Sequence, residues 1–282
     1  FTLSQFRETI GRYEVSKQKP SFNRNEINTL QFESKDLVNY FDNGFFHAAY
    51  QPQVNPITRE VVGIECLARL KHPIYGEIPP LEFIDQLVEK QLIGDFTLLL
   101  MDTAFNDCKH LLASNPKMAI AFNISSLSLS QSFTSEVLTL VQKYMIPPSQ
   151  VTIEITETRA ISLSQDALYS VSKYRASGFN LSIDDFGTGY STIMQLHDLP
   201  FNELKIDHSF VDKISKSEKS KKIVEATVSM ANSLSLMIVA EGVETDEQLN
   251  LLIEMGCRII QGYIFSKPLP IEALHKYIAN IK

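Results

Sequence analysis

The chain has 282 residues, 44% of them hydrophobic and 21% charged, which suits one large core and argues against a disordered or fibrous protein. Its formal net charge of -7 disfavours nonspecific binding to a nucleic acid polymer, which needs clustered lysine and arginine. Cys66, Cys108 and Cys257 form no CxxC pair, which argues against a disulfide framework or a zinc site and favours a cytoplasmic location.

The first part of the chain differs in character from the rest. Residues 2–13 have apolar side chains at helical spacing and predict a short amphipathic helix, and the polar residues 16–28 read as a linker. Because the chain begins with Phe1 rather than Met, we expect residues 1–33 to belong to an upstream regulatory domain and residues 34–282 to form the main domain. No apolar run approaches the roughly 20 residues of a membrane span, so we expect no membrane contact from this segment.

Short β-prone runs alternate with segments of helical period throughout the main domain. The predicted strands are residues 48–54, 61–70, 118–124, 151–156, 180–186, 203–207, 236–242 and 258–265. Helical segments are predicted between most of these strands, for example residues 81–90, 95–112, 130–144, 165–176, 216–234 and 245–255.

This alternation predicts an α/β fold with parallel strands and helical crossovers, and about eight strands is the number that closes a modified (β/α)8 TIM-type barrel. An open doubly wound sheet is the competitor, but no GxGxxG opens the first helix. The connection between the first two strands is only about ten residues, which suits a hairpin better than a crossover. The sequence therefore also allows an antiparallel first strand.

Polar residues interrupt or end nearly every predicted strand, although a buried parallel strand should be apolar. An unpaired carboxylate there costs on the order of several kcal/mol. The residues are Glu65, Asn123, Glu154, Asp184, Asp185, Lys205, Glu241 and Gln261. For any one of them, a core residue paired with a neighbour is an equally good explanation. For the whole set, convergence on the carboxyl-terminal face of a barrel explains every case together.

So many carboxylates could not all stay ionised in one pocket without more positive charge than Lys205 and Arg69 provide. Oxygen ligands without histidine or cysteine select hard cations such as Mg²⁺ or Mn²⁺. Such a cluster can bind two ions about 4 Å apart that activate water for attack on phosphorus. The expected reaction is phosphodiester hydrolysis.

The segment GIECLAR (63–69) resembles the signature of the EAL-domain cyclic di-GMP phosphodiesterases, with Cys66 in place of alanine. Further similar segments follow in family order: YQPQV (50–54), FNIS (122–125), EITET (154–158), DDFGTGYST (184–192), LKID (204–207), AEGVET (240–245) and QGYIFSKP (261–268). The resemblance covers about residues 40–282 and implies a modified (β/α) barrel.

The resemblance also implies roles for individual residues. One metal ion would be held by Glu65, Asn123, Glu154 and Asp184, and the second by Asp184, Asp185 and Glu241. Lys205 would position the attacking water. Glu241 would serve as metal ligand or as general base, and we favour the ligand role because metal activation makes a separate base less necessary.

Substrate and loop roles complete the set of predictions. Gln51 is predicted to contact a guanine base, Gln261 to orient water or substrate, and Arg69 to bind a phosphate. A partnership of Arg69 with Glu65 on the same strand face is an equal alternative. By resemblance the loop after Asp185 links the metal site to a homodimer interface, and the residues expected to support it are Glu157, Asp207 and Glu244.

The expected function is hydrolysis of cyclic di-GMP to linear pGpG, which lowers the level of this bacterial second messenger. A noncatalytic cyclic di-GMP receptor is the main alternative, although every expected ligand is present here. Barrel hydrolases for other phosphodiesters are a second alternative. Those sites use catalytic histidines, which these strand ends lack.

Overall fold

The computed structural model describes residues 31–156, 164–187, 196 and 198–281. Within them the chain divides into two compact units. The smaller unit comprises the described residues up to Ala48 together with Ala68–Leu100, and the larger comprises Ala49–Leu67 and the residues from Met101 onward. The predicted helix over residues 2–13 and the linker lie outside the described residues.

The smaller unit is built on an aromatic core. Helices α2 (Ser34–Asp42) and α3 (Pro80–Glu89) contribute to it, as does the antiparallel pairing of β3 (Gly76–Ile78) with the end of β2 (Val61–His72). Phe32, Leu37, Phe83 and other apolar side chains form one buried cluster there. Helix α4 (Ile93–Ser114) begins in this unit and continues into the larger one.

The larger unit contains a closed ring of strands. Their order is β1-β9-β8-β7-β6-β5-β4-β2, and β1 pairs in addition with β2. The bounds are β1 Phe46–Val54, β4 Ala119–Asn123, β5 Val151–Thr156, β6 Asn180–Phe186, β7 Glu203–Ile206, β8 Met237–Ala240 and β9 Ile259–Ile260. The pairs from β2–β4 through β8–β9 are parallel, whereas β1 pairs with β9 antiparallel. The predicted barrel is confirmed, with an antiparallel first strand.

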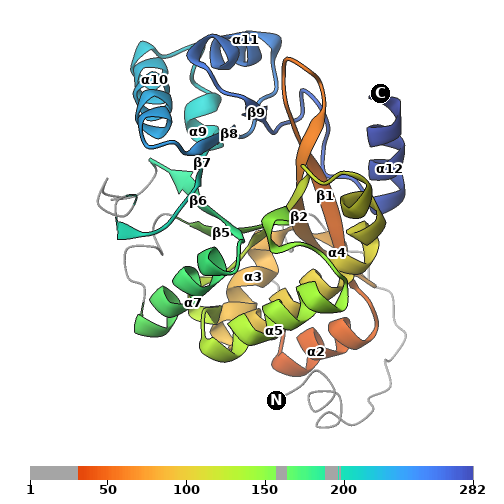
Figure 1. Cartoon of the computed structure of the whole chain (residues 1–282). Coiled ribbons are helices and arrows are strands. Elements are labelled where there is room, and N and C mark those ends of the chain that lie inside the picture. Colours follow the sequence, from red (N-terminus) through yellow and green to blue (C-terminus); the bar gives the residue numbers. More distant parts are fainter. Residues whose placement is uncertain (1–30, 157–163, 188–195, 197, 282) are drawn as a thin grey trace. The chain divides into compact units, whose positions relative to one another are not determined.

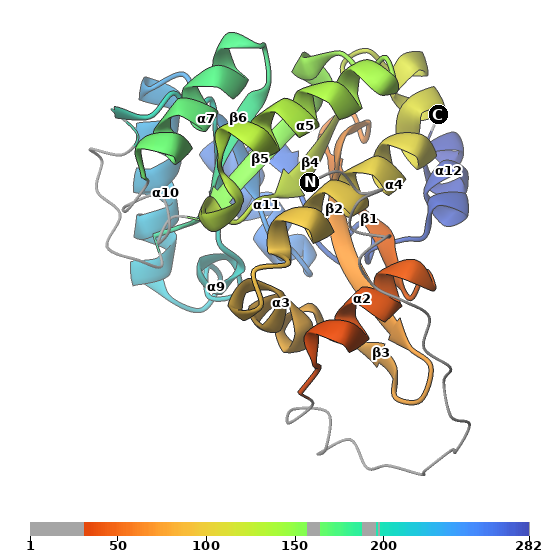
Figure 2. The same ribbon diagram turned by 90° about the horizontal axis from the view of Figure 1, so that it is seen from below.

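Helices lie outside the strands that they connect (Figures 1 and 2). Helix α7 packs on β6, and α10 packs on β7 and β8. The helices of this unit after α4 are α5 Gln131–Lys143, α7 Gln165–Ala176, α9 His208–Val211, α10 Glu218–Ser233, α11 Asp246–Met255 and α12 Ile271–Asn280, with 3-10 turns at Ser126–Ser128 and Pro148–Gln150. Among the helices of the described residues, none combines the length and apolarity that a membrane crossing requires.

Strand β4 ends one residue earlier than predicted, at Asn123. Three further strands also end early, each for a local reason. Strand β7 stops at Ile206 because Asp207 caps α9, its carboxylate accepting from the Ser209 amide at 3.0 Å. Strand β8 stops at Ala240, and Gly242 then turns the chain with φ 68°. Strand β9 is limited to Ile259–Ile260 because residues 262–266 form a turn.

Candidate active site

Four carboxylates from four segments of the ring meet the buried ammonium group of Lys205. Its Nζ lies 2.7 Å from Glu241 Oε1 and 2.9 Å from Glu154 Oε2. Asp184 Oδ1 is 3.4 Å away and Glu65 Oε1 is 3.6 Å away. The residues belong to β2, β5, β6 and β7, and Glu241 directly follows β8, so the parallel direction of these strands brings the side chains to one end of the ring.

Burial disfavours the ionised forms of the side chains in this cluster. Glu154 is completely buried, and burial together with the neighbouring carboxylates raises its pKa well above the usual range despite Lys205. Burial likewise raises the pKa of Glu241 to about 8. Burial opposes the charge of Lys205, but the four carboxylates outweigh it and hold the pKa of its ammonium well above the usual value.

Glu65 has the most complete set of partners. Burial opposes its ionisation, but Lys205 and two amide donors outweigh it, so the pKa of Glu65 is lowered. Asn123 Nδ2 donates to Glu65 Oε1 at 2.7 Å, and Gln261 Nε2 donates to Glu65 Oε2. Gln261 Nε2 also contacts Gln51 Oε1 at 3.2 Å. The structure therefore joins Glu65 to Lys205, Asn123 and Gln261, which were predicted on separate strands.

A bulge places the two consecutive aspartates on the same site. In a regular strand, Asp184 and Asp185 would point to opposite faces. The register of β6 against β7 shifts between Ile183 and Phe186, and Asp185 adopts φ 56°. Oxygens of Asp184, Asp185 and Glu241 consequently lie within 4.8 Å of one another. Burial and the Asp184 charge raise the pKa of Asp185 to about 6.

These residues fit a divalent-cation site. In the described part of the chain, four carboxylates pair with Lys205 and the Asp185 carboxylate lies beside two of them, which leaves about four negative charges when all five are ionised. Two divalent cations would balance them. Among the described residues, Glu154 Oε1 is buried with no hydrogen-bond partner, as expected of an oxygen that serves as a cation ligand. The donors are oxygen atoms, which suits Mg²⁺ or Mn²⁺.

The remaining predicted residues have other hydrogen-bond partners or are not described, although the Asp207 carboxylate also acts on Asp185 and helps to raise its pKa. Arg69 belongs to the smaller unit, where it is half-buried and its Nη1 donates to the Ala68 carbonyl at 2.7 Å. Glu244 is exposed, and its backbone amide donates to Gln248. Asp207 is buried and caps α9. Glu157 and the loop over residues 188–195 lie outside the described residues.

Gln53 and Glu203 are among the buried polar residues of the ring that the sequence analysis missed. Gln53 is 6% exposed and donates to Gln261 Oε1 at 3.0 Å. Glu203 is buried two residues before Lys205, and burial raises the pKa of its carboxyl. The alternation of Gln51 with Gln53 in YQPQV was a usable signal, because residues two apart share a strand face.

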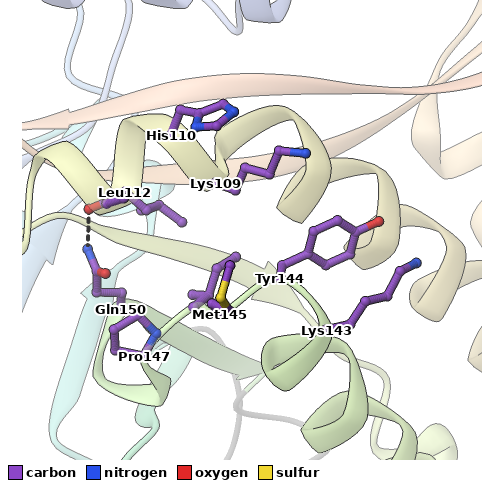
Figure 3. Close-up of a pocket in the computed structure, with 10 residues that line it drawn as sticks. Lys109, His110, Leu112, Lys143, Tyr144, Met145, Pro147 and Gln150 are labelled. Atoms are coloured by element: carbon purple, nitrogen blue, oxygen red, sulfur yellow. Dashed lines mark hydrogen bonds between the residues drawn. The ribbon is translucent and has the colours of Figure 1, made fainter.

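A pocket of about 390 Å³ is lined by the last turns of α4 and α5 and by the segment that follows α5 (Figure 3). Its floor is largely apolar, and Lys109, His110 and Lys143 carry the basic groups. Lys143 Nζ is paired with Asp102 at 2.5 Å. Gln150 Nε2 bonds the Leu112 carbonyl at 3.0 Å, which satisfies the C-terminal end of α4. This pocket lacks the converging carboxylates of the first site.

The chain belongs to the EAL domain family, whose model matches residues 34–268. It is 34% identical to the cyclic di-GMP phosphodiesterase RocR of Pseudomonas aeruginosa over 282 residues, which cover 99% of this chain and 71% of RocR. It is 36% identical to the oxygen sensor protein DosP of Escherichia coli, covering 87% of this chain but 31% of DosP. The family predicted from the sequence motifs is confirmed.

Solved structures show the same fold. The PaMucR phosphodiesterase in complex with c-di-GMP matches with a TM-score of 0.80 and 33% identity, covering 85% of this chain and 98% of that one. BlrP1 of Klebsiella pneumoniae, in a calcium and cyclic di-GMP complex, matches with a TM-score of 0.71 and 30% identity, covering 80% of this chain and 56% of that one.

Proposed function

We propose that this EAL domain is a divalent-metal-dependent phosphodiesterase that opens one phosphodiester of cyclic di-GMP to give linear pGpG. The observation that carries the proposal is the convergence of Glu65, Glu154, Asp184 and Glu241 on one buried lysine. The similarity to RocR over nearly the whole chain and to the c-di-GMP complex of PaMucR supports the choice of substrate.

Two cations would be held by the ligand sets expected from the family. Glu65, Asn123, Glu154 and Asp184 would bind one ion, and Asp184, Asp185 and Glu241 the second. When bound, Mg²⁺ or Mn²⁺ would lower the pKa of a water molecule and neutralise phosphoryl oxygens. In the hydrolysis, water oxygen bonds to phosphorus, one phosphorus–sugar oxygen bond breaks, and the departing oxygen takes up a proton.

The protein's own groups would orient and hold protons in this reaction. Lys205 keeps its protons because four carboxylates surround it, so it can direct an N–H group toward the attacking water or a phosphate oxygen. Glu241 lies with Asp184 and Asp185 in the cluster of close oxygens, which supports its role as a metal ligand rather than as a separate base. Gln51 and Arg69 remain proposed contacts for guanine and phosphate.

We further propose that the domain acts as a homodimer in the cytoplasm. The loop through which the family resemblance links site and interface includes residues 188–195, outside the described residues. Sedimentation of the purified chain with and without cyclic di-GMP tests the dimer directly. A monomer under both conditions at micromolar concentration contradicts it.

The decisive experiment is turnover by the purified chain. With Mg²⁺ or Mn²⁺, cyclic di-GMP should be converted to pGpG, whereas calcium or a chelator should stop the reaction. Glu65→Ala should lower kcat/KM by more than about 100-fold, because a direct ligand matters more than a partner outside the ligand shell. Tight nucleotide binding without product under either metal would establish the noncatalytic receptor instead.

A further inference from the structure

Gln53 is joined to the proposed metal ligand Glu65 through Gln261 and has no assigned role. It stands on β1 two residues after Gln51, so both side chains leave the strand on the same face. Its side chain is buried at 6% exposure, and its Nε2 donates to Gln261 Oε1 at 3.0 Å. Gln53 therefore bonds the oxygen of the Gln261 amide, whose NH2 group bonds Glu65.

The bonds to Gln53 and Glu65 together favour one orientation of the Gln261 amide. An amide has one accepting oxygen and one donating NH2 group. With Oε1 accepting from Gln53, the NH2 group points to Glu65 Oε2 and lies 3.2 Å from Gln51 Oε1. In the reversed orientation, the NH2 group of Gln261 would face the NH2 group of Gln53. Its oxygen would face the Glu65 carboxylate. The observed orientation is the one that satisfies all three neighbours.

The neighbouring strand leaves the space that Gln53 occupies. A Cβ atom at Gly63 on β2 would lie 2.3 Å from Gln53 Oε1, well inside the contact limit. The same atom would lie 3.5 Å from the Ala119 carbonyl oxygen. The missing side chain at position 63 therefore makes room for the Gln53 amide, and the packing there restricts its rotation.

We propose that Gln53 is a positioning residue, which acts through the Gln261 amide to hold Glu65 in its metal-binding orientation. The inference rests on the proposed function, in which Glu65 binds a divalent cation. Groups that orient a metal ligand without binding the metal themselves commonly contribute about 10- to 100-fold to metal affinity or activity. Gln53 does not touch the substrate or the reacting atoms in this scheme.

The test uses the full chain, with substitutions of Gln53 and a matched control. Gln53→Met keeps the approximate volume and removes the donor, whereas Gln53→Glu places an accepting carboxylate there and favours the reversed Gln261 amide. Gln150→Met is the matched control, since Gln150 is also a buried glutamine of the larger unit but bonds carbonyls at the end of α4. Calorimetric titration with Mn²⁺ measures metal affinity without requiring turnover.

We expect Gln53→Met to weaken Mn²⁺ binding and lower kcat by at least about 10-fold, with a smaller change in KM. Gln53→Glu should have the larger effect. Gln150→Met should lower Tm and leave Mn²⁺ affinity unchanged. Because Gln53 acts through Gln261, the double variant with Gln261→Met should bind Mn²⁺ no more weakly than Gln261→Met alone.

Two results would overturn the inference. One is Mn²⁺ affinity within about twofold of the wild type for the folded Gln53 variants, since a positioning role predicts a larger loss. The other is a double variant whose losses simply add, because additivity means that Gln53 acts independently of Gln261. If the variants weaken Mn²⁺ binding but the wild type yields no pGpG, the proposed function fails while the positioning role stands.

Discussion

The backbone amide of Asp185 donates to the carboxylate of its neighbour Asp184 at 3.0 Å, while Asp185 itself adopts φ 56°. Consecutive side chains of an extended strand diverge, so this local reversal is what lets both aspartates serve one site. Such left-handed residues cost on the order of 1–3 kcal/mol and concentrate at functional sites. Asparagine and aspartate tolerate this conformation better than most residues.

Asp185→Asn is therefore expected to keep the bulge and remove one of the crowded charges. Without metal, the variant should be at least as stable as the wild type in urea, because burial and Asp184 disfavour the Asp185 charge. With Mn²⁺, its rise in Tm should be smaller than that of the wild type. An unchanged Mn²⁺ response would remove Asp185 from the proposed ligands.

Lys205→Met separates metal binding from catalysis. Removing one partner of a buried ion pair typically costs about 3–5 kcal/mol, so the metal-free variant should unfold at markedly lower urea concentration. The uncompensated carboxylates should then bind Mn²⁺ more tightly than in the wild type, while turnover is lost. Calorimetry and the pGpG assay measure the two effects. Weaker Mn²⁺ binding would contradict the charge balance described above.

Gly242→Ala tests the turn that follows Glu241. Gly242 adopts φ 68°, and a Cβ atom there would lie 2.4 Å from His208 Cβ. The substitution should lower stability by about 1–3 kcal/mol and reduce turnover by displacing Glu241. Ala273→Gly on α12, within an ordinary helix, is the comparison for a change of similar size. Wild-type stability and turnover in Gly242→Ala would show that the turn accommodates a Cβ atom without moving the Glu241 carboxylate.

The hydrogen bonds of His72 predict that the smaller unit loses stability in acid. Its Nδ1 accepts from the Ile74 and Tyr75 amides at 3.1 Å each, and its Nε2 contacts the Tyr40 hydroxyl at 2.8 Å. Burial lowers the pKa of His72, although Asp36 acts in the opposite direction. Between the two pKa values the unfolded chain binds more protons than the folded one. The contribution of His72 is therefore complete above about pH 6.5 and is lost as pH falls through the folded pKa.

Amide hydrogen exchange at Ile74 and Tyr75 between pH 8 and pH 5 measures this loss, after correction for intrinsic exchange rates. His72→Asn is the informative variant, because its side-chain oxygen can accept from the same two amides without titrating. Its protection should be lower than in the wild type at pH 8 but nearly independent of pH. Equal pH dependence in both proteins would exclude His72 as the sensor.

The strands and helices could be predicted because their signals are local. Hydrophobic period located α7 at the predicted residues and most other elements within two residues. The interrupting polar residues identified the site because parallel strands end at one side of the ring. Helices α2, α9 and α12 and strand β3 were not predicted. Strand ends were misplaced where Asp207 and Gly242 turn the chain through a cap and a positive φ.

By itself, the sequence determined the order of the eight strands of the ring, the family, and the acidic residues at the strand ends. The tertiary structure decided the antiparallel pairing of β1 with β9, the bulge at Asp185, the burial of Lys205 among four carboxylates, and the place of Gln53 behind Gln261. The reason is physical: periodicity acts over a few residues, whereas these arrangements depend on atoms that are distant in sequence and meet only when the ring closes.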